Sequence, residues 1–203
     1  VAIHPNDAAR MRPDELPLAL AEIEQLGCHP RVRAIGETGL DHYRTRDDAG
    51  HRTQRDAFAW HIALARATRK TLVIHDRDAH AEVLDVLDAE GVPERVVMHC
   101  FSGDADFARA CLDRGAWLSY AGPIPFKPNE QLREALRITP LDRILTETDA
   151  PYLTPVPYRG RANASYLIPH TARFMAEELD LDLVAVCEAL EQNAYAAFGG
   201  PWG

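Results

Sequence analysis

The stretch VRAIGETGLDHY, residues 32–43, decides the fold prediction for this chain. A short apolar run ends at Gly36, and the next residue is the carboxylate Glu37. Because a glycine lets a strand turn sharply, the side chain after it is expected to point out of the end of a sheet. Taken alone, the stretch leaves open the alternative that Glu37 only caps the helix that follows.

The same pattern recurs along the chain, where short apolar runs alternate with segments of helical periodicity. Strands are predicted at residues 1–3, 32–35, 71–74, 95–98, 116–120 and 143–146. Helices are predicted at residues 13–26, 52–69, 79–89, 105–114, 129–137, 168–179 and 182–198. This alternation predicts a parallel α/β sheet. A stretch rich in proline, arginine and glycine is expected to form a long functional loop at residues 150–164.

Polar residues follow five of the predicted strands, namely His4, Glu37, His75, His99 and Asp149. In a closed (β/α)8 barrel such positions meet at one mouth, where active sites are built, whereas an open doubly wound sheet would spread most of them out. We therefore predict a TIM-type (β/α)8 barrel, as a single domain over residues 1–203. No GxGxxG or GxxxxGK[ST] motif follows a strand, which argues against a nucleotide cofactor.

The composition limits the classes of protein to consider. The 203 residues are 46% hydrophobic, enough for a sizeable core, and no apolar run approaches the roughly 18 residues of a membrane span. A net charge of −9 argues against a broad basic surface for nucleic acid, although a small basic cleft or one neutralised by cations remains possible. Scattered cysteines suggest reduced thiols in a cytoplasmic protein, with Cys111 and Cys187 buried as apolar residues.

Histidines and carboxylates at one barrel mouth would bind divalent cations. His75 and His99 end successive strands, which favours a shared ion over the alternative of two unrelated polar residues. Asp149 lies in a tight turn that would fix its direction. His4 is followed by Pro5, so it also fits a simple strand end. Two ions about 3.5–4 Å apart would clamp a phosphoryl group and activate a water molecule.

Five segments in order give the chain a family resemblance: GETGLD (36–41), VIHDRDA (73–79), VMHCFSG (97–103), SYAGPIPFK (119–127) and ETDAPYLTP (147–155). They resemble those of the TatD-type metal-dependent deoxyribonucleases, in the amidohydrolase-like barrel superfamily. The resemblance runs from Val1 to about Phe198, and VAIHP (1–5) is similar to the family's third strand. The family usually has histidine where Asn6 stands.

The resemblance implies a role for each matching residue. Glu37 would bridge two metal ions, His75 and His99 would complete one of them, and Asp149 would bind the other and orient or deprotonate the attacking water. These assignments make Glu37 and Asp149 the catalytic residues. Positions near the phosphate or the substrate strand are matched by His4, Arg77, Arg161 and Asn163. A surface salt bridge remains the alternative for Arg77, and Ala164 and Ser165 follow Asn163 where the family commonly has Glu-Pro.

The resemblance implies hydrolysis of phosphodiester bonds in DNA, from the 3′ end of single strands. The cofactors would be one or two divalent ions per chain, with Mg²⁺ in use and Zn²⁺ or Mn²⁺ able to bind. The expected partner is a DNA substrate, with no membrane and no nucleotide cofactor. Another hydrolase of the superfamily, cleaving an amide, lactone or phosphotriester, is the alternative. Many of those enzymes bridge their metals with a carboxylated lysine, whereas Glu37 occupies that place here.

The family's first strand carries a His-x-His pair, and no HxH occurs in this sequence. A complete barrel usually needs about 250 residues. We therefore expect the first one or two βα units to be missing, which leaves an inactive fragment as a further alternative. In that case the chain alone would bind at most one divalent ion tightly and show little or no nuclease activity.

Overall fold

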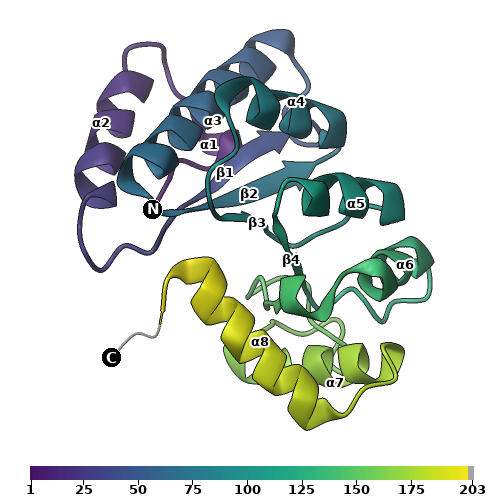
Figure 1. The fold of residues 1–203 in the computed structure, drawn as a ribbon. Helices are drawn as coiled ribbons and strands as arrows, with labels where there is room; N and C mark the ends of the chain where they lie inside the picture. Colours follow the sequence, from purple (N-terminus) through teal and green to yellow (C-terminus); the bar gives the residue numbers. More distant parts are fainter. Residues whose placement is uncertain (201–203) are drawn as a thin grey trace. The chain divides into compact units, whose positions relative to one another are not determined.

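The computed structural model describes residues 1–200, which divide into two compact units. The first unit comprises residues 1–99 with 197–199, and the second comprises residues 100–196 with 200. Figure 1 shows the elements of both units, coloured along the chain. Each unit has parallel strands and helices of its own.

The first unit is built from two successive βαβ crossovers. Its elements are α1 (Pro5–Ala8), α2 (Leu16–Gly27), β1 (Ala34–Asp41), α3 (Asp48–Thr68), β2 (Thr71–Arg77), α4 (His80–Glu90) and β3 (Val96–Met98). The strands are parallel, with Leu72 of β2 paired to Ile35 of β1 and to Val96 of β3. Parallel strands need such helical crossovers, and α3 packs along β1 in the upper part of Figure 1.

Apolar side chains from both layers form the core of the first unit. The fully buried set from β1, β2, α3 and α4 comprises Ile35, Leu40, Leu72, Ile74, Phe58, Ile62, Val83 and Leu87. A smaller cluster of Ile3, Ala8 and Ala57 joins the N-terminal segment to α3 and is covered by side chains of α2. This packing ties residues 1–8 to the sheet that carries the predicted site.

The second unit contains a parallel pair of strands with its own helices. Its elements are α5 (Ala105–Asp113), β4 (Trp117–Tyr120), α6 (Glu130–Ile138), β5 (Ile144–Thr146), α7 (Ile168–Glu178) and α8 (Leu183–Phe198), with 3₁₀ turns at Leu141–Arg143 and Ser165–Leu167. Leu118 pairs with Ile144 and Tyr120 with Thr146. The buried amide of Asn193, on α8, donates to the carbonyls of Leu141 and Ile144 and so holds the start of β5.

Every predicted helix is present, with its ends displaced by a few residues, but one predicted strand is absent and another was given the wrong end. Residues 1–3 form no strand: Val1 exchanges backbone hydrogen bonds with Ala34 and Gly36 of β1, but the N–H of Ile3 donates to the ring of His61 and the pairing stops there. The strand predicted at residues 32–35 runs on to Asp41, so Glu37 lies within β1 and not after it. The short helix α1 was not predicted.

The cysteine prediction was half right. Cys111 is buried on α5, whereas Cys187 on α8 is exposed. The inward stripe of α8 consists of Val186, Leu190, Asn193 and Ala197, and Cys187 lies one position away from it. Apolar character alone therefore does not show which face of a helix a cysteine occupies.

Candidate metal centre

A bulge in β1 positions the carboxylate of Glu37. Ile35 pairs with Leu72 and Thr38 with Ile74, so two residues of β1 lie opposite one residue of β2. Such a bulge re-aims a side chain, here that of Glu37. Only glycine fits at Gly36, since its φ is +157° and a Cβ would lie 2.5 Å from the Cβ of Val73.

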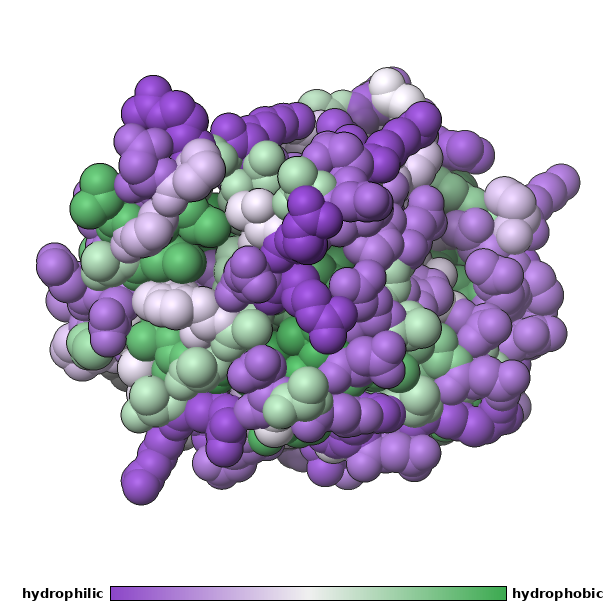
Figure 2. Space-filling view, turned by 90° about the horizontal axis from the view of Figure 1, so that it is seen from above, coloured by the Kyte–Doolittle hydropathy of each residue, from purple (hydrophilic) through white to green (hydrophobic). Residues whose placement is uncertain are grey.

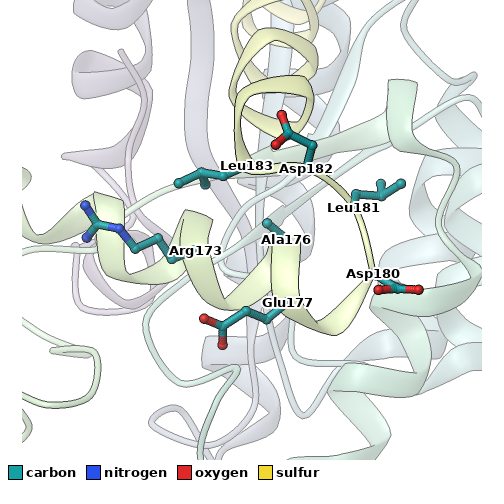
Figure 3. Close-up of a pocket in the computed structure, with 7 residues that line it drawn as sticks. All are labelled: Arg173, Ala176, Glu177, Asp180, Leu181, Asp182 and Leu183. Carbon is teal, nitrogen blue, oxygen red and sulfur yellow. The ribbon is translucent and has the colours of Figure 1, made fainter.

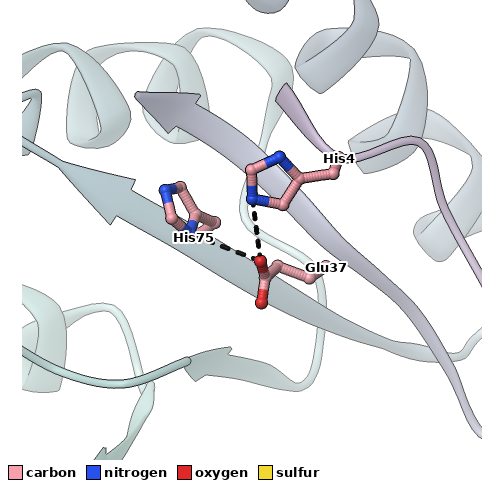
Figure 4. Close-up of side chains that lie close together, drawn as sticks. All are labelled: His4, Glu37 and His75. Atoms are coloured by element: carbon pink, nitrogen blue, oxygen red, sulfur yellow. Dashed lines mark ion pairs between the residues drawn. The ribbon is translucent and has the colours of Figure 1, made fainter. Parts of the chain in front are cut away.

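Glu37 lies among three imidazoles. Its Oε1 is 2.9 Å from Nε2 of His4 and 3.4 Å from Nδ1 of His75, and its Oε2 is 2.7 Å from Nε2 of His99. Figure 4 shows the rings of His4 and His75 converging on the same carboxylate oxygen. The structure thus brings together four of the residues singled out in the sequence, and all four lie in the first unit.

The environment of Glu37 keeps its carboxylate ionised. Burial by itself would raise the pKa of Glu37, but hydrogen bonds with His4, His75 and His99 outweigh burial and hold this pKa far below its usual value. The side chain of Glu37 is 28% exposed, so the group is partly open to solvent. An ionised carboxylate with two available oxygens is a suitable ligand for a divalent cation.

The hydrogen bonds of His4 decide which of its nitrogens carries the proton. His4 caps α1, and its Nδ1 accepts the backbone N–H of Asn6 at 3.1 Å. A neutral imidazole that accepts at Nδ1 has its proton on Nε2, which is the atom that faces Glu37. Although His4, Glu37 and His75 lie close enough to hold an ion together, His4 is therefore a hydrogen-bond donor at this place.

His75 is arranged in the opposite way. Its Nε2 lies 3.2 Å from Oδ2 of the buried Asp41. Burial alone would raise the pKa of Asp41, but the backbone N–H of Arg44, the amide of Asn6 and the ring of His75 together lower it. An ionised Asp41 can only accept, so His75 donates from Nε2 and turns Nδ1 toward Glu37.

This geometry fits a cation. Nδ1 of His75 lies 3.4 Å from Oε1 of Glu37. A divalent ion bound between them would take the place of a proton there, with both atoms as ligands. Two ligand atoms that are each about 2.1 Å from a tetrahedral ion lie about 3.4 Å apart. Glu37 and His75 thus have the spacing of two ligands of one ion, while the part of His99, whose Nε2 lies 2.7 Å from Oε2 of Glu37, stays a prediction.

Arg77 ends β2 two residues beyond His75, and its guanidinium lies 3.8 Å above the ring centre of Tyr43. Tyr43 is 49% exposed, so the pair presents a cationic and aromatic surface. The sequence offered a salt bridge as the alternative for Arg77, and the structure shows this cation–π contact. Its role toward a substrate stays a prediction.

The remaining predicted residues, Asp149, Arg161 and Asn163, belong to the second unit. Asp149 follows β5 and adopts a left-handed backbone, with φ of 54°. The buried amide of Asn163 donates to the carbonyls of Thr148 and Tyr152, which lie on either side of Asp149. Asn163 therefore ties its loop together around Asp149, while Arg161 is exposed.

Sequence reasoning missed the residues behind His75. Asp41 stood in the quoted GETGLD segment but was given no role, and Asn6 was noted only as a departure from the family. Their hydrogen bond, 2.8 Å long, joins residues 35 positions apart. One signal could have indicated Asp41. It is an acidic residue four positions after Glu37, and side chains an even number of positions apart in a strand lie on the same side of the sheet.

A separate surface pocket of about 460 Å³ lies in the second unit, where α7 turns into α8 (Figure 3). It is lined by Arg173, Ala176, Glu177, Asp180, Leu181, Asp182 and Leu183. None of the predicted site residues lines it.

The face of the molecule in Figure 2 is mostly hydrophilic, with hydrophobic side chains in small scattered groups. No helix within residues 1–200 combines the length and the apolar character that crossing a membrane requires.

The model of the family described as TatD related DNase matches residues 1–199. The chain belongs to this family. A Mycobacterium tuberculosis protein described as an uncharacterized metal-dependent hydrolase TatD is 47% identical over all of the chain and 76% of its own length. The Bacillus subtilis metal-dependent hydrolase YabD is 37% identical, over 96% of the chain and 74% of its own length. The family resemblance inferred from the five segments is thereby confirmed, and the chain is a metal-dependent hydrolase.

Solved structures confirm the fold class. The crystal structure of an Escherichia coli TatD homologue, YJJV, superposes with a TM-score of 0.89 at 24% identity, over 99% of this chain and 76% of that one. A TatD-family hydrolase from Entamoeba histolytica gives a TM-score of 0.77 at 20% identity, over 97% of this chain and 73% of its own. The TatD-family chain therefore has the TIM-type barrel fold, and it spans about three quarters of these proteins.

Proposed function

We propose that this TatD-family hydrolase cleaves phosphodiester bonds in DNA, working from the 3′ end of single strands with divalent ions. The observation that carries the proposal is the convergence of Glu37 and His75, whose Oε1 and Nδ1 lie 3.4 Å apart, the spacing of two ligands on one tetrahedral ion. Both atoms can coordinate a divalent ion, and a family model described as a DNase matches the same chain. The proposal joins a metal site in the first unit to the nuclease chemistry of the family.

Four residues of the first unit, together with Asp149, have a defined part in the proposed reaction. Glu37, His75 and His99 hold the ion, which when bound withdraws charge from the phosphoryl oxygen and acidifies water. His4 donates from Nε2, which faces Oε1 of Glu37 in the absence of substrate. When a substrate is bound, this N–H is suited to donate to a negatively charged phosphate oxygen instead. Asp149 keeps the role that the family gives it, which is to orient the attacking water and accept its proton.

The donor set also bears on which metal is used. One carboxylate and two imidazoles are borderline ligands that bind Zn²⁺ and Mn²⁺ well, while Mg²⁺ prefers oxygen ligands and water. We propose Mg²⁺ as the ion in use and expect Zn²⁺ and Mn²⁺ to compete for the site. Crystals soaked in Mn²⁺ should give an anomalous peak among Glu37, His75 and His99.

The alternative is a superfamily hydrolase that acts on amides, lactones or phosphotriesters. Such enzymes often bridge their metals with a carboxylated lysine. Lys70 precedes β2, at the end opposite His75, and its ammonium group bonds to the carbonyls of Gly27 and His29. Lys127 lies in the loop before α6. Neither lysine takes the place of Glu37, which favours the phosphodiesterase.

A substrate panel with one variant tests the proposal. We expect the purified protein to shorten 5′-labelled single-stranded DNA in Mg²⁺ or Mn²⁺, to act more slowly on duplex DNA, and to stop in excess chelator. Glu37→Gln keeps the shape of the side chain but removes its charge, so this variant should lose both hydrolysis and tight Mn²⁺ binding.

The melting temperature of Glu37→Gln in chelator should fall, because a neutral amide replaces the ionised carboxylate that the imidazoles stabilise, and circular dichroism should show that the variant is folded at the assay temperature. Turnover at the wild-type rate by Glu37→Gln would refute the metal role. Hydrolysis of a lactone or amide without any cleavage of DNA would favour the alternative.

A further inference from the structure

A buried chain of hydrogen bonds leads from the middle of α3 to the candidate metal ligand His75. Gln54 on α3 donates from Nε2 to Oγ1 of Thr45 at 2.8 Å, and this hydroxyl donates to Oδ1 of Asn6 at 3.2 Å. Asn6 donates from Nδ2 to Oδ2 of Asp41 at 2.8 Å. The same oxygen of Asp41 lies 3.2 Å from Nε2 of His75.

The direction of every hydrogen bond in this network follows from the orientation of Gln54, its first residue. The backbone N–H of Asp41 donates to Oε1 of Gln54 at 2.9 Å, which fixes the orientation of the Gln54 amide. Its NH₂ group therefore faces Thr45, and the hydroxyl proton of Thr45 must turn to Asn6. The oxygen of the Asn6 amide is thus directed at Thr45, and its NH₂ group is left for Asp41.

The carboxylate of Asp41 consequently accepts hydrogen bonds and donates none. Its Oδ1 accepts the backbone N–H of Arg44 at 2.8 Å, while Oδ2 accepts from Asn6 and from His75. Exposure is 1% for Asp41, 7% for Asn6 and 0% for Gln54, so water does not compete for these bonds. Buried polar groups that are all satisfied make such a network rigid.

We propose that Asp41 and Asn6 are positioning residues for the metal centre, which keep the proton of His75 on Nε2 and its Nδ1 lone pair directed at the ion. This inference rests on the metal site proposed above and extends it beyond the residues that would touch the ion. Asn6 serves two histidines at once, because its backbone N–H fixes the proton of His4 while its side chain acts on His75.

The isosteric change Asn6→Asp isolates this role. It keeps the volume of the side chain, removes the NH₂ donor and sets a second carboxylate against Asp41. Asp41 then loses the donor that holds its Oδ2 toward Nε2 of His75, so the orientation of the His75 ring is no longer fixed. Outer partners of metal-binding histidines typically contribute about 10–100-fold to metal affinity, so we expect a loss of that size for Mn²⁺.

The experiment compares three variants by titration calorimetry with Mn²⁺ and by melting in excess chelator. Asn6→Asp should bind Mn²⁺ about 10–100-fold more weakly than the wild type. Asn6→His restores a ring N–H donor and should recover most of the affinity. Asn193→Asp is the matched control, since it changes an equally buried amide that bonds only to carbonyls around β5. It should lower the melting temperature and leave Mn²⁺ affinity unchanged.

Two results would overturn the inference. The first is equal Mn²⁺ affinity of Asn6→Asp and the wild type, and the second is an affinity loss in Asn193→Asp as large as that in Asn6→Asp. Either result would leave the proposed nuclease function untouched, since that depends on hydrolysis of DNA by the wild type. Conversely, a wild-type protein that binds Mn²⁺ tightly but cleaves no DNA would refute the nuclease while leaving the positioning role intact.

Discussion

Acidification should destabilise the first unit through a histidine that lies outside the metal centre. His61 is fully buried on α3, where its Nδ1 lies 2.6 Å from the carbonyl oxygen of Ala57 and its Nε2 accepts the N–H of Ile3 at 3.2 Å. The neutral ring satisfies both neighbours, whereas a proton on Nε2 would face the N–H of Ile3. Burial lowers the pKa of His61 from 6.5 to about 4, against an opposing contribution from its bond to Ala57.

The size and direction of the effect follow from this difference in pKa. Above pH 6.5 His61 is neutral in both the folded and the unfolded chain, so its contribution to stability is fully present. As the pH falls below 6.5 the unfolded chain takes up the proton first, and the loss continues until the folded pKa of about 4 is reached. At about 1.36 kcal/mol per pKa unit, the free energy of unfolding should fall by roughly 2 kcal/mol at about pH 5 and roughly 3 kcal/mol at about pH 4.

Urea unfolding followed by circular dichroism measures this loss, and His61→Gln supplies the control. The glutamine keeps an acceptor for Ile3 but cannot be charged, so the variant should be less stable near neutral pH. Its stability should then decline about 3 kcal/mol less than that of the wild type between about pH 7 and pH 4. Parallel declines for the two proteins would refute the assignment of His61 as a buried neutral histidine.

Two further predictions concern the sheet and the surface beside the site. Gly39→Ala should destabilise the protein by about 1–3 kcal/mol in thermal melting, because φ is +137° and a Cβ would lie 2.0 Å from the carbonyl oxygen of His75; an unchanged melting temperature would contradict this close contact between β1 and β2. Arg77→Ala should weaken binding of single-stranded DNA and reduce the salt slope by about one ion, whereas Arg109→Ala on α5 should change neither. Equal effects of the two arginine changes would count against a substrate role for Arg77.

The sequence indicated the proposed metal ligands because their positions follow a local rule. His75 continues the apolar run of β2, and His99 directly follows β3, so the strand period alone placed them at the same edge. Glu37 was also placed at this site, but for the wrong reason. The strand does not end at Gly36, and a bulge within a longer strand directs the carboxylate.

The supporting residues could not be found in the same way. Asn6 meets Asp41 across 35 positions of sequence, and neither the spacing nor the composition of either segment indicates that contact. Asn163 was expected near the substrate, and its loop position was right. Its burial and its bonds to two backbone carbonyls depend on how the loop closes on itself, which no local pattern encodes.

The bulge in β1 makes the number of residues between Ile35 and Thr38 as important as their identity. Ile35 packs toward α2 and Thr38 bonds to His61 on α3, so both face the helices although they lie three positions apart. A regular strand, in which sides alternate, would place them on opposite faces. Deleting or inserting one residue here would turn either the core side of β1 or Asp41 to the wrong face. A variant that keeps every proposed ligand but changes the number of residues between Ile35 and Thr38 would therefore disrupt either the core packing of β1 or the contact between Asp41 and His75.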